Sequence, residues 1–465
     1  MVVTVGGEFQ RYGRVFSPHS ASIHASELFT TLGVIVKKGI IALLVVLALI
    51  VLVSPGIVGM LAEKSVDEQI EWARLENQDL VITTEQFDRG WFSSAGRHRI
   101  GLENAANAPG LRELLGLSGS DSLPALIIDT KLNHGPIDLS SLAGENTSFV
   151  PGLGNAVSTL SVEMTDGELI GLPGTVYSSL GLTGDLQSKF RARAGTHDKV
   201  TWGDINIDFA SIASNGDYAY DGLIESMQIA EQDNVVDLAN LSFSGDLTMS
   251  EFAFAVGDMH IALDGLSVAS GSRSPTSIGP LVFDTTSSVS GGRVDSSSEL
   301  RLKIDEIPNV GQIELDTKVS VVGLDGAALK QLVQALQNVQ TSADPYAAMS
   351  AIETELLDVL AAGADLRIER LDVALPQGTI KSAVNIKFLE SDNADFGWSS
   401  LLLALEADAR FEIPEMIANM AMMMSPQAGA VEGFLRKNGD VYELEAAYKK
   451  GLLTVNGVPL PIPIQ

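Results

Sequence analysis

The chain has 465 residues, of which 59 are acidic and 30 are basic, and its formal net charge is −29 at pH 7. This excess of carboxylates argues against nucleic acid as a partner, because phosphate binding needs clustered Lys and Arg. The sequence contains no cysteine, which excludes disulfides and thiolate metal sites.

Residues 1–35 are rich in Ser, Thr and Gly and show no hydrophobic period, which predicts a disordered cytoplasmic tail. A second interpretation concerns the start of the protein. Val36, followed by Lys37 and Lys38, has the form of a short basic start of an exported protein if Val36 is read from an alternative bacterial initiation codon. On that interpretation the natural protein begins at Val36, and residues 1–35 are not translated.

A stretch without any charge, from Gly39 to Ala62, follows these two lysines. A helix of about 20 apolar residues crosses a hydrocarbon core about 30 Å thick, and Lys or Arg marks the cytoplasmic flank. We therefore predict a transmembrane signal anchor over residues 36–62, with residues 39–61 in the bacterial inner membrane. The N-terminus then lies in the cytoplasm and the bulk of the chain in the periplasm.

The alternative for this stretch is a cleaved signal peptide, because Ile40–Val53 has the length of an h-region. The best small-residue cleavage site is Ser54-Pro55-Gly56. Cleavage there would leave an apolar N-terminus, whereas an uncleaved anchor uses Ile57–Leu61 as its outer turn. We expect the uncleaved anchor.

The pattern after the anchor predicts a mainly β fold with some α (α+β). Residues 63–80 are expected to form a membrane-proximal helix, and from Val81 the hydrophobic period is two. Leu300, Leu302 and Ile304, for example, alternate with charged residues, which indicates strands with one apolar face and one wet face. We predict a periplasmic β domain over residues 81–412, built as an extended, long-stranded antiparallel sheet with covering helices. The apolar parity changes between Ile368 and Leu371, which predicts a bulge or a bend.

A helical insert is predicted over residues 325–363. Asp325 is a candidate N-cap for its first helix, and Pro345 stands at the first position of the second helix. Gly363 is expected to end that helix. We expect this helical hairpin to cover an apolar sheet face or to plug an open end of the sheet.

The last predicted unit, residues 413–465, combines a helix with a β-hairpin. Met416, Ile417, Met420 and Met424 recur at helical spacing and therefore share one face. We expect this face to fill a core against the hairpin; the alternative is an apolar groove for a lipid or a partner, which methionine also suits.

Residues that carry chemistry are sparse. No HExxH, GxSxG, P-loop or EF-hand pattern is present. The histidines beyond the anchor are isolated in sequence: His98, His134, His197 and His260. We therefore expect no catalytic residues, no metal, no cofactor and no enzymatic activity, and we expect His260 to point to a wet face.

Three short segments are more specific. They are DRGWFSS (Asp88–Ser94), HGP (His134–Pro136) and YKKGLLTVNGVPLP (Tyr448–Pro461). In this order, after an N-terminal anchor, they resemble the uncharacterised bacterial envelope family typified by YdgA, over the chain from about Lys37 to its end. The resemblance implies an inner-membrane-anchored periplasmic protein of unknown biochemical role. The motif residues are expected to be structural: Gly90, Trp91, Phe92, Ser93, His134, Gly135, Pro136 and the tight turn Asn456-Gly457.

Three functions follow as hypotheses. The first is a non-catalytic envelope scaffold or interaction protein, with an envelope protein or a second copy as its partner. The second is a carrier that holds lipid or another apolar ligand in a groove of the curved sheet, and the third is a hydrolase. An apolar groove that is open to solvent and wide enough for an acyl chain would favour the carrier, and a sealed core would favour the scaffold. A buried histidine within reach of a carboxylate and a hydroxyl would favour the hydrolase.

Overall fold

The computed structural model describes residues 81–89, 93–101, 123–134, 152–163, 167–181, 183–197, 200–231, 234–270, 276–307, 311–341, 345–391, 397–424 and 433–460. The expected tail, the anchor (36–62) and the membrane-proximal helix (63–80) lie outside these ranges. Within them, no helix has the length and apolar character needed to cross a membrane.

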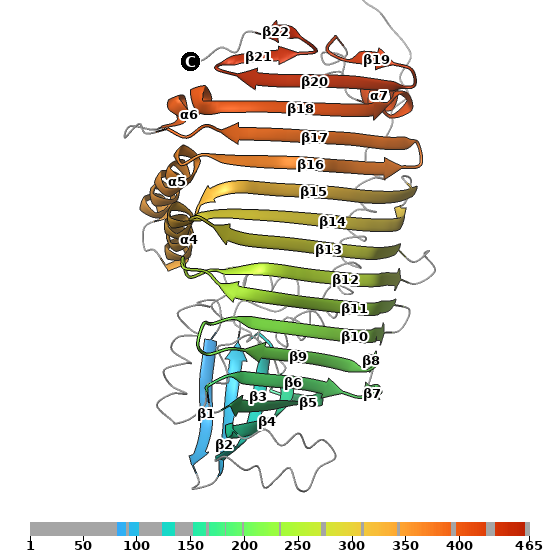
Figure 1. Ribbon diagram of the computed structural model, residues 1–465. Coiled ribbons are helices and arrows are strands. Elements are labelled where there is room, and N and C mark those ends of the chain that lie inside the picture. The colour runs from blue at the N-terminus through green and yellow to red at the C-terminus, as the bar shows by residue number, and fades with distance from the viewer. Residues whose placement is uncertain are drawn as a thin grey trace, which may run out of the picture.

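One antiparallel sheet of 22 strands forms most of the described part of the chain (Figure 1). It begins with five strands that pair in chain order: β1 (Val81–Arg89), β2 (Ser93–Gly101), β3 (Ala125–His134), β4 (Gly152–Glu163) and β5 (Leu169–Gly181). Pairing continues through β6 (Leu186–Ala192), β9 (Ile205–Ser211) and β10 (Tyr218–Glu231). A short hairpin, β7 (Gly195–His197) and β8 (Val200–Trp202), attaches to β10.

The rest of the sheet is a meander of long strands. It runs through β11 (Asn234–Met249), β12 (Ala255–Ser270), β13 (Thr276–Ser290), β14 (Arg293–Ile307), β15 (Gly311–Asp325), β16 (Ala364–Leu375), β17 (Gly378–Phe388), β18 (Leu405–Pro414) and β20 (Val441–Lys449). Three short strands complete it: β19 (Arg436–Asn438), β21 (Leu452–Val455) and β22 (Val458–Leu460). The predicted antiparallel sheet of long strands is confirmed.

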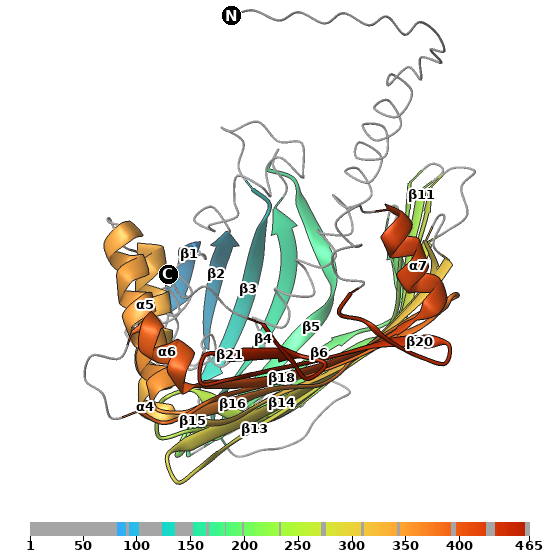
Figure 2. The same ribbon diagram turned by 90° about the horizontal axis from the view of Figure 1, so that it is seen from above.

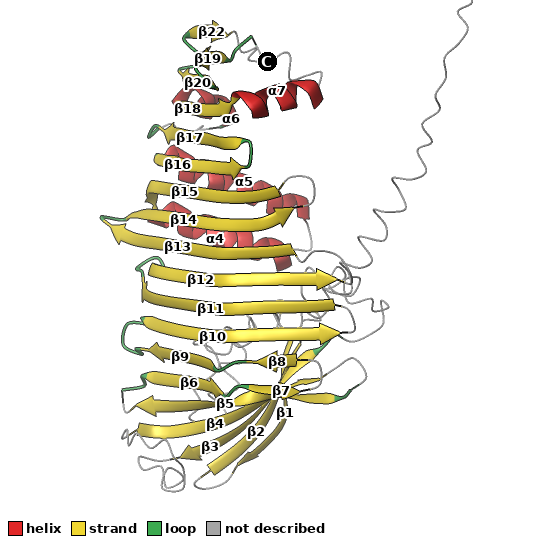
Figure 3. Cartoon of the chain, turned by 90° about the vertical axis from the view of Figure 1, so that its right-hand side faces the viewer, coloured by secondary structure: helices red, strands yellow, loops and turns green. Residues whose placement is uncertain are grey.

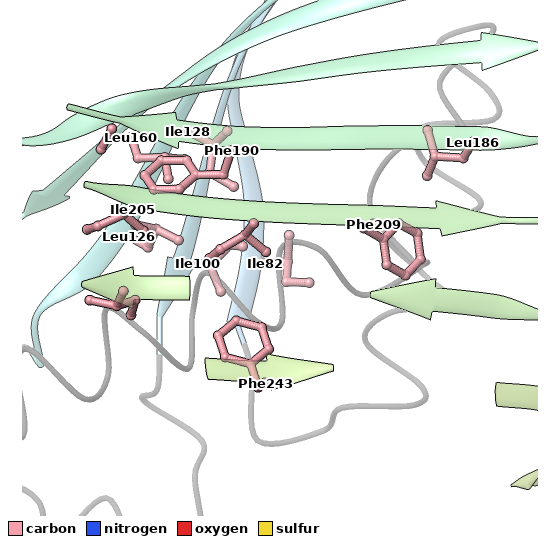
Figure 4. Packing of buried hydrophobic residues seen from close by; sticks show 13 residues of the cluster. Ile82, Ile100, Leu126, Ile128, Leu160, Leu186, Phe190, Ile205, Phe209 and Phe243 are labelled. Carbon is pink, nitrogen blue, oxygen red and sulfur yellow. The ribbon is translucent and has the colours of Figure 1, made fainter. Parts of the chain in front are cut away.

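The long part of the sheet is curved, and β1–β5 lie on its concave side (Figure 2). Side chains from β1–β4 there meet side chains from β6 and β9–β11 in one hydrophobic cluster (Figure 4). Ile207 and Ile224 are 0% exposed, Leu160 is 1% exposed and Phe190 is 2% exposed. The main core therefore sits where the sheet folds back over itself, at its N-terminal end.

Four helices border the long strands: α4 (Gly326–Thr341), α5 (Pro345–Ala361), α6 (Trp398–Ala404) and α7 (Glu415–Met424). The predicted caps are confirmed. One carboxylate oxygen of Asp325 accepts hydrogen bonds from the backbone N–H groups of Ala327 and Ala328, at 3.1 and 2.9 Å. Gly363, just beyond α5, has a φ of 82°, which favours glycine.

The helical hairpin α4–α5 stands beside the ends of the strands (Figure 1). It therefore lies at an end of the sheet, as in the second of the two expected positions, and does not extend across the apolar face. The parity change is confirmed as a register shift between Ile368 and Leu371, where two residues of β16 lie against one residue of β17. The C-terminal segment continues the same sheet, because β20 pairs with β18 over its full length.

Candidate functional site: the apolar concave face

The apolar residues of neighbouring long strands are aligned in register. One row of cross-strand partners runs Leu241, Leu263, Leu281, Leu302, Leu315, Val373 and Ile380, from β11 to β17. A parallel row runs Phe243, Ile261, Phe283, Leu300, Thr317, Leu371, Ser382, Phe411 and Leu444, from β11 to β20. We call the surface that these two rows form the apolar concave face.

Phe243 identifies the side of the sheet on which this face lies. It belongs to the buried cluster that β1 and β2 share with the long strands, and β1–β5 lie on the concave side (Figure 2). Residues opposite one another in register share a face. The remainder of each row therefore also lines the concave side.

Most of this face is not sealed by the part of the chain that the structure describes. The partly buried residues that pack against the core cluster reach no further along the sheet than Ile261 of β12. From β12 to β20 the apolar members of both rows are half-buried, neither in the core nor fully exposed. The longer row crosses eight strand spacings of about 4.8 Å, so the face is about 38 Å long.

The opposite face of the same strands is charged. A row of cross-strand partners there runs His260, Asp284, Glu299, Lys318 and Arg370. The Nδ1 atom of His260 lies 2.6 Å from a carboxylate oxygen of Asp284, which confirms that His260 points to a wet face. Arg370 lies 2.8 Å from Glu299. The long sheet is therefore amphipathic, with one charged face and one apolar face.

The β16 bulge lies beside a charged hollow of about 410 Å³ on this part of the sheet. It is lined by Lys318, Glu369, Arg370, Asp372, Lys381, Ser382, Ala383, Arg410 and Glu412. Glu369 accepts from Lys318 Nζ at 2.9 Å and from the Ser320 hydroxyl at 2.8 Å, and these two hydrogen bonds lower the pKa of its carboxyl. Cations and carboxylates alternate in the hollow, so its charges largely neutralise one another.

His98 is the buried histidine of the described chain, with an exposed fraction of 6%. Its Nδ1 lies 3.2 Å from the Thr84 hydroxyl, while its Nε2 has no hydrogen-bond partner. Burial lowers the pKa of the imidazole. Among the interactions that the structure records for His98, none is with a carboxylate, so the arrangement expected of a hydrolase is not assembled around it.

The structure brings two of the three family segments together. Ser93, at the start of β2, pairs with Asn133 at the end of β3, so the described ends of the DRGWFSS and HGP segments lie on neighbouring strands. Gly90, Trp91, Phe92, Gly135 and Pro136 fall outside the described residues, and Ser93 and His134 are described only as strand backbone. The structural role expected of Trp91 and Phe92 therefore stays a prediction.

The third segment lies at the far end of the sheet, in β20–β22 (Figure 3). Asn456 and Gly457 have φ values of 47° and 80°, as a tight primed hairpin turn requires. The Asn456 side chain also accepts from the Glu445 N–H at 2.8 Å and donates to the Phe434 carbonyl at 2.6 Å. This pair has the structural role that the sequence predicts.

One family profile matches the chain over both ends of the sheet. The profile, for a bacterial protein of unknown function (DUF945), matches residues 36–463. The chain belongs to the DUF945 family. Searches of the curated proteins and of the solved structures gave no match. Family membership therefore supplies a bacterial origin and no activity.

The methionine helix α7 differs from the sequence expectation. Met416 is 58% exposed and Met420 is 41% exposed, whereas Ala418 is 5% exposed and faces the sheet. Ile417 is half-buried, and the side chain of Met424 is not described. The expected core face is wrong for Met416 and Met420, because α7 packs on β18 and β20 through its smallest side chain.

The sequence suggested a carrier groove in the curved sheet, but it assigned candidate groove residues only to the methionine helix and not to the long strands. Alternation identified the apolar residues of each strand, but a strand pattern does not state what covers its apolar side. A usable signal was present in the pattern of elements: residues in long strands far outnumber the residues in the described helices that could cover them. Helix α4, α5, α6 and α7 together are too few to form a second layer.

Proposed function

We propose that this chain is a non-catalytic, inner-membrane-anchored protein of the bacterial cell envelope that carries acyl chains or similar apolar ligands on its apolar concave face. The observation that carries this proposal is the in-register alignment of half-buried apolar side chains over nine strands. A sheet face of this kind holds elongated apolar ligands without a specific pocket.

The energetics favour reversible binding. Complete burial of a Leu or Phe side chain stabilises the folded state by about 1.5–3 kcal/mol. The residues of this face are half-buried, so they contribute only part of that free energy. A ligand that covers these residues removes their remaining apolar surface from water, and each CH₂ group that is buried contributes about 0.8 kcal/mol to binding. An acyl chain that leaves a bilayer exchanges one apolar environment for another, so the net gain is small. Such a face is better suited to the transfer of acyl chains than to their tight, long-lived binding.

The localisation belongs to the same proposal. The uncleaved anchor at residues 39–61 and the basic pair Lys37-Lys38 support an N-terminus in the cytoplasm and a periplasmic sheet. The resemblance to YdgA-like envelope proteins points to the same compartment. A periplasm-active reporter fused after Gln465 should be active. Activity of a cytoplasmic reporter at that position would reverse the orientation.

Photo-crosslinking tests the carrier role in the full-length chain in cells. A diazirine amino acid is placed at Leu302 on the concave face, and at the adjacent Arg301 on the charged face as the matched control. We expect phospholipid adducts, detected by mass, several-fold more often at Leu302 than at Arg301. Equal labelling at the two positions would contradict the proposal.

The scaffold is distinguished by the same experiment. A protein partner that covers the concave face would give protein adducts at Leu302 and no lipid adducts. A second copy of the chain would give a crosslinked dimer of twice the mass.

A further inference from the structure

Two short helices stand at the two ends of one strand. Helix α6 ends at Ala404, β18 follows directly as Leu405–Pro414, and α7 begins at Glu415. Both helices rise on the concave side of the sheet, at opposite rims (Figure 2). Together with β18 they therefore bracket the apolar concave face, whose row includes Phe411 of this strand.

Both rim helices expose apolar side chains. On α6, Trp398 is 50% exposed, Leu402 is 43% exposed and Leu403 is 61% exposed. On α7, Met416 and Met420 are exposed while Ala418 is buried. A helix that serves only to cover a sheet would turn its large apolar side chains inward. Met416 and Met420 on α7 do the reverse, so these two side chains are available for another apolar surface.

The two helices themselves are nearly free of charge, although the indole N–H of Trp398 donates to Glu353 of the neighbouring α5 at 2.5 Å. Helix α6 has no charged residue, and α7 has only Glu415, which pairs with Lys437 at 2.5 Å. The chain as a whole has 59 acidic and 30 basic residues and a formal net charge of −29. An acidic protein approaches a bilayer most easily through an uncharged edge, where repulsion and desolvation cost least.

We infer that α6 and α7 dock the two rims of the concave face into the interface of the bilayer that holds the anchor. The chain between the expected anchor and β1, residues 62–80, spans at most about 65 Å when extended, so the sheet stays within reach of that bilayer. Trp and apolar side chains prefer the interfacial region. The inference rests on the proposed carrier role, because docking would place the acyl-chain surface against its lipid source.

Depth-dependent quenching tests this contact with the full-length chain. The protein lacks cysteine, so single Cys substitutions at Leu403 or Met416 accept a fluorescent label without background. Lys381→Cys, exposed in the charged hollow, is the control. The purified chain is reconstituted into liposomes whose phospholipid tails are brominated. We expect quenching at Leu403→Cys and Met416→Cys to exceed that at Lys381→Cys several-fold.

Equal quenching at all three labels would overturn the docking. No other protein is present in the liposomes, so a protein partner cannot mask the result. Lipid crosslinks at Leu302 without quenching at the rims would leave the carrier role standing and refute the docking alone. Quenching at the rims without crosslinks at Leu302 would establish the docking and refute the carrier. Unchanged circular dichroism spectra confirm that each labelled variant is folded.

Discussion

Strands β9 and β14 show the same alternation in sequence but lie in different surroundings. In β9, Ile205, Ile207 and Phe209 are at most 4% exposed, because β1–β4 lie over them. In β14, Leu300 and Leu302 occupy equivalent positions on the same side of the sheet and are only half-buried. The N-terminal region is thus a two-layered fold with a core. Within the described residues, the region from β12 to β20 has no second sheet over it.

Because of this difference, one region of the sheet contains the core that stabilises the fold, and another region has the surface that we propose binds ligand. A two-layered region removes its apolar surface from water, which is the dominant contribution to folding free energy. A single layer gains stability from its backbone ladder and from its neighbours in the sheet, and it keeps an apolar face available. The proposed ligand surface begins where the second layer ends.

The largest expected effect is in the two-layered region. Phe190 is 2% exposed and lies within the cluster (Figure 4). Phe190→Ala should reduce the free energy of unfolding by about 3–5 kcal/mol, because it removes transfer energy and leaves a cavity. Chemical denaturation followed by circular dichroism measures this. A loss below about 1 kcal/mol would show that the cluster is not a packed core.

The matched substitution in the single layer is Phe283→Ala. Phe283 lies in the longer row, half-buried between Ile261 and Leu300. Only part of its surface is removed from water, so we expect a loss of about 1–2 kcal/mol. A loss equal to that of Phe190→Ala would mean that the concave face is covered in solution, and the comparison between the two regions would fail.

Much of the fold could be predicted from local sequence. The cap at Asp325, the turn at Asn456-Gly457 and the bulge after Ile368 depend on a few adjacent residues, and all three are confirmed. The exposure of Met420 could not be predicted in this way. It depends on which face α7 turns toward β18, and that is set by tertiary packing. The helical period identifies which residues share a face of the helix. It does not identify the part of the protein, or the solvent, that this face contacts.

Burial of His98 makes the stability of the two-layered region depend on pH. Burial lowers the pKa of this histidine in the folded state, so the unfolded chain binds its proton more readily. The free energy of unfolding is therefore highest above the pKa of histidine in the unfolded chain, about 6.5. It decreases as pH falls from there toward the lower pKa of His98 in the folded protein. His98→Gln should flatten the fall in melting temperature over this window. An unchanged slope would assign the dependence to other groups.

The smallest effect is expected on the charged face of the single layer. Glu369 bonds Lys318 and the Ser320 hydroxyl, and these contacts lower the pKa of its carboxyl. Its contribution is therefore present above the unfolded pKa and lost as pH falls. Both charged side chains remain about 40% exposed, so solvent screens the pair, and Glu369→Gln should cost at most about 1 kcal/mol. The melting temperature at pH 7 in low and high salt measures this. A loss as large as that of Phe190→Ala would mean that the charged face, and not the two-layered core, holds the sheet together.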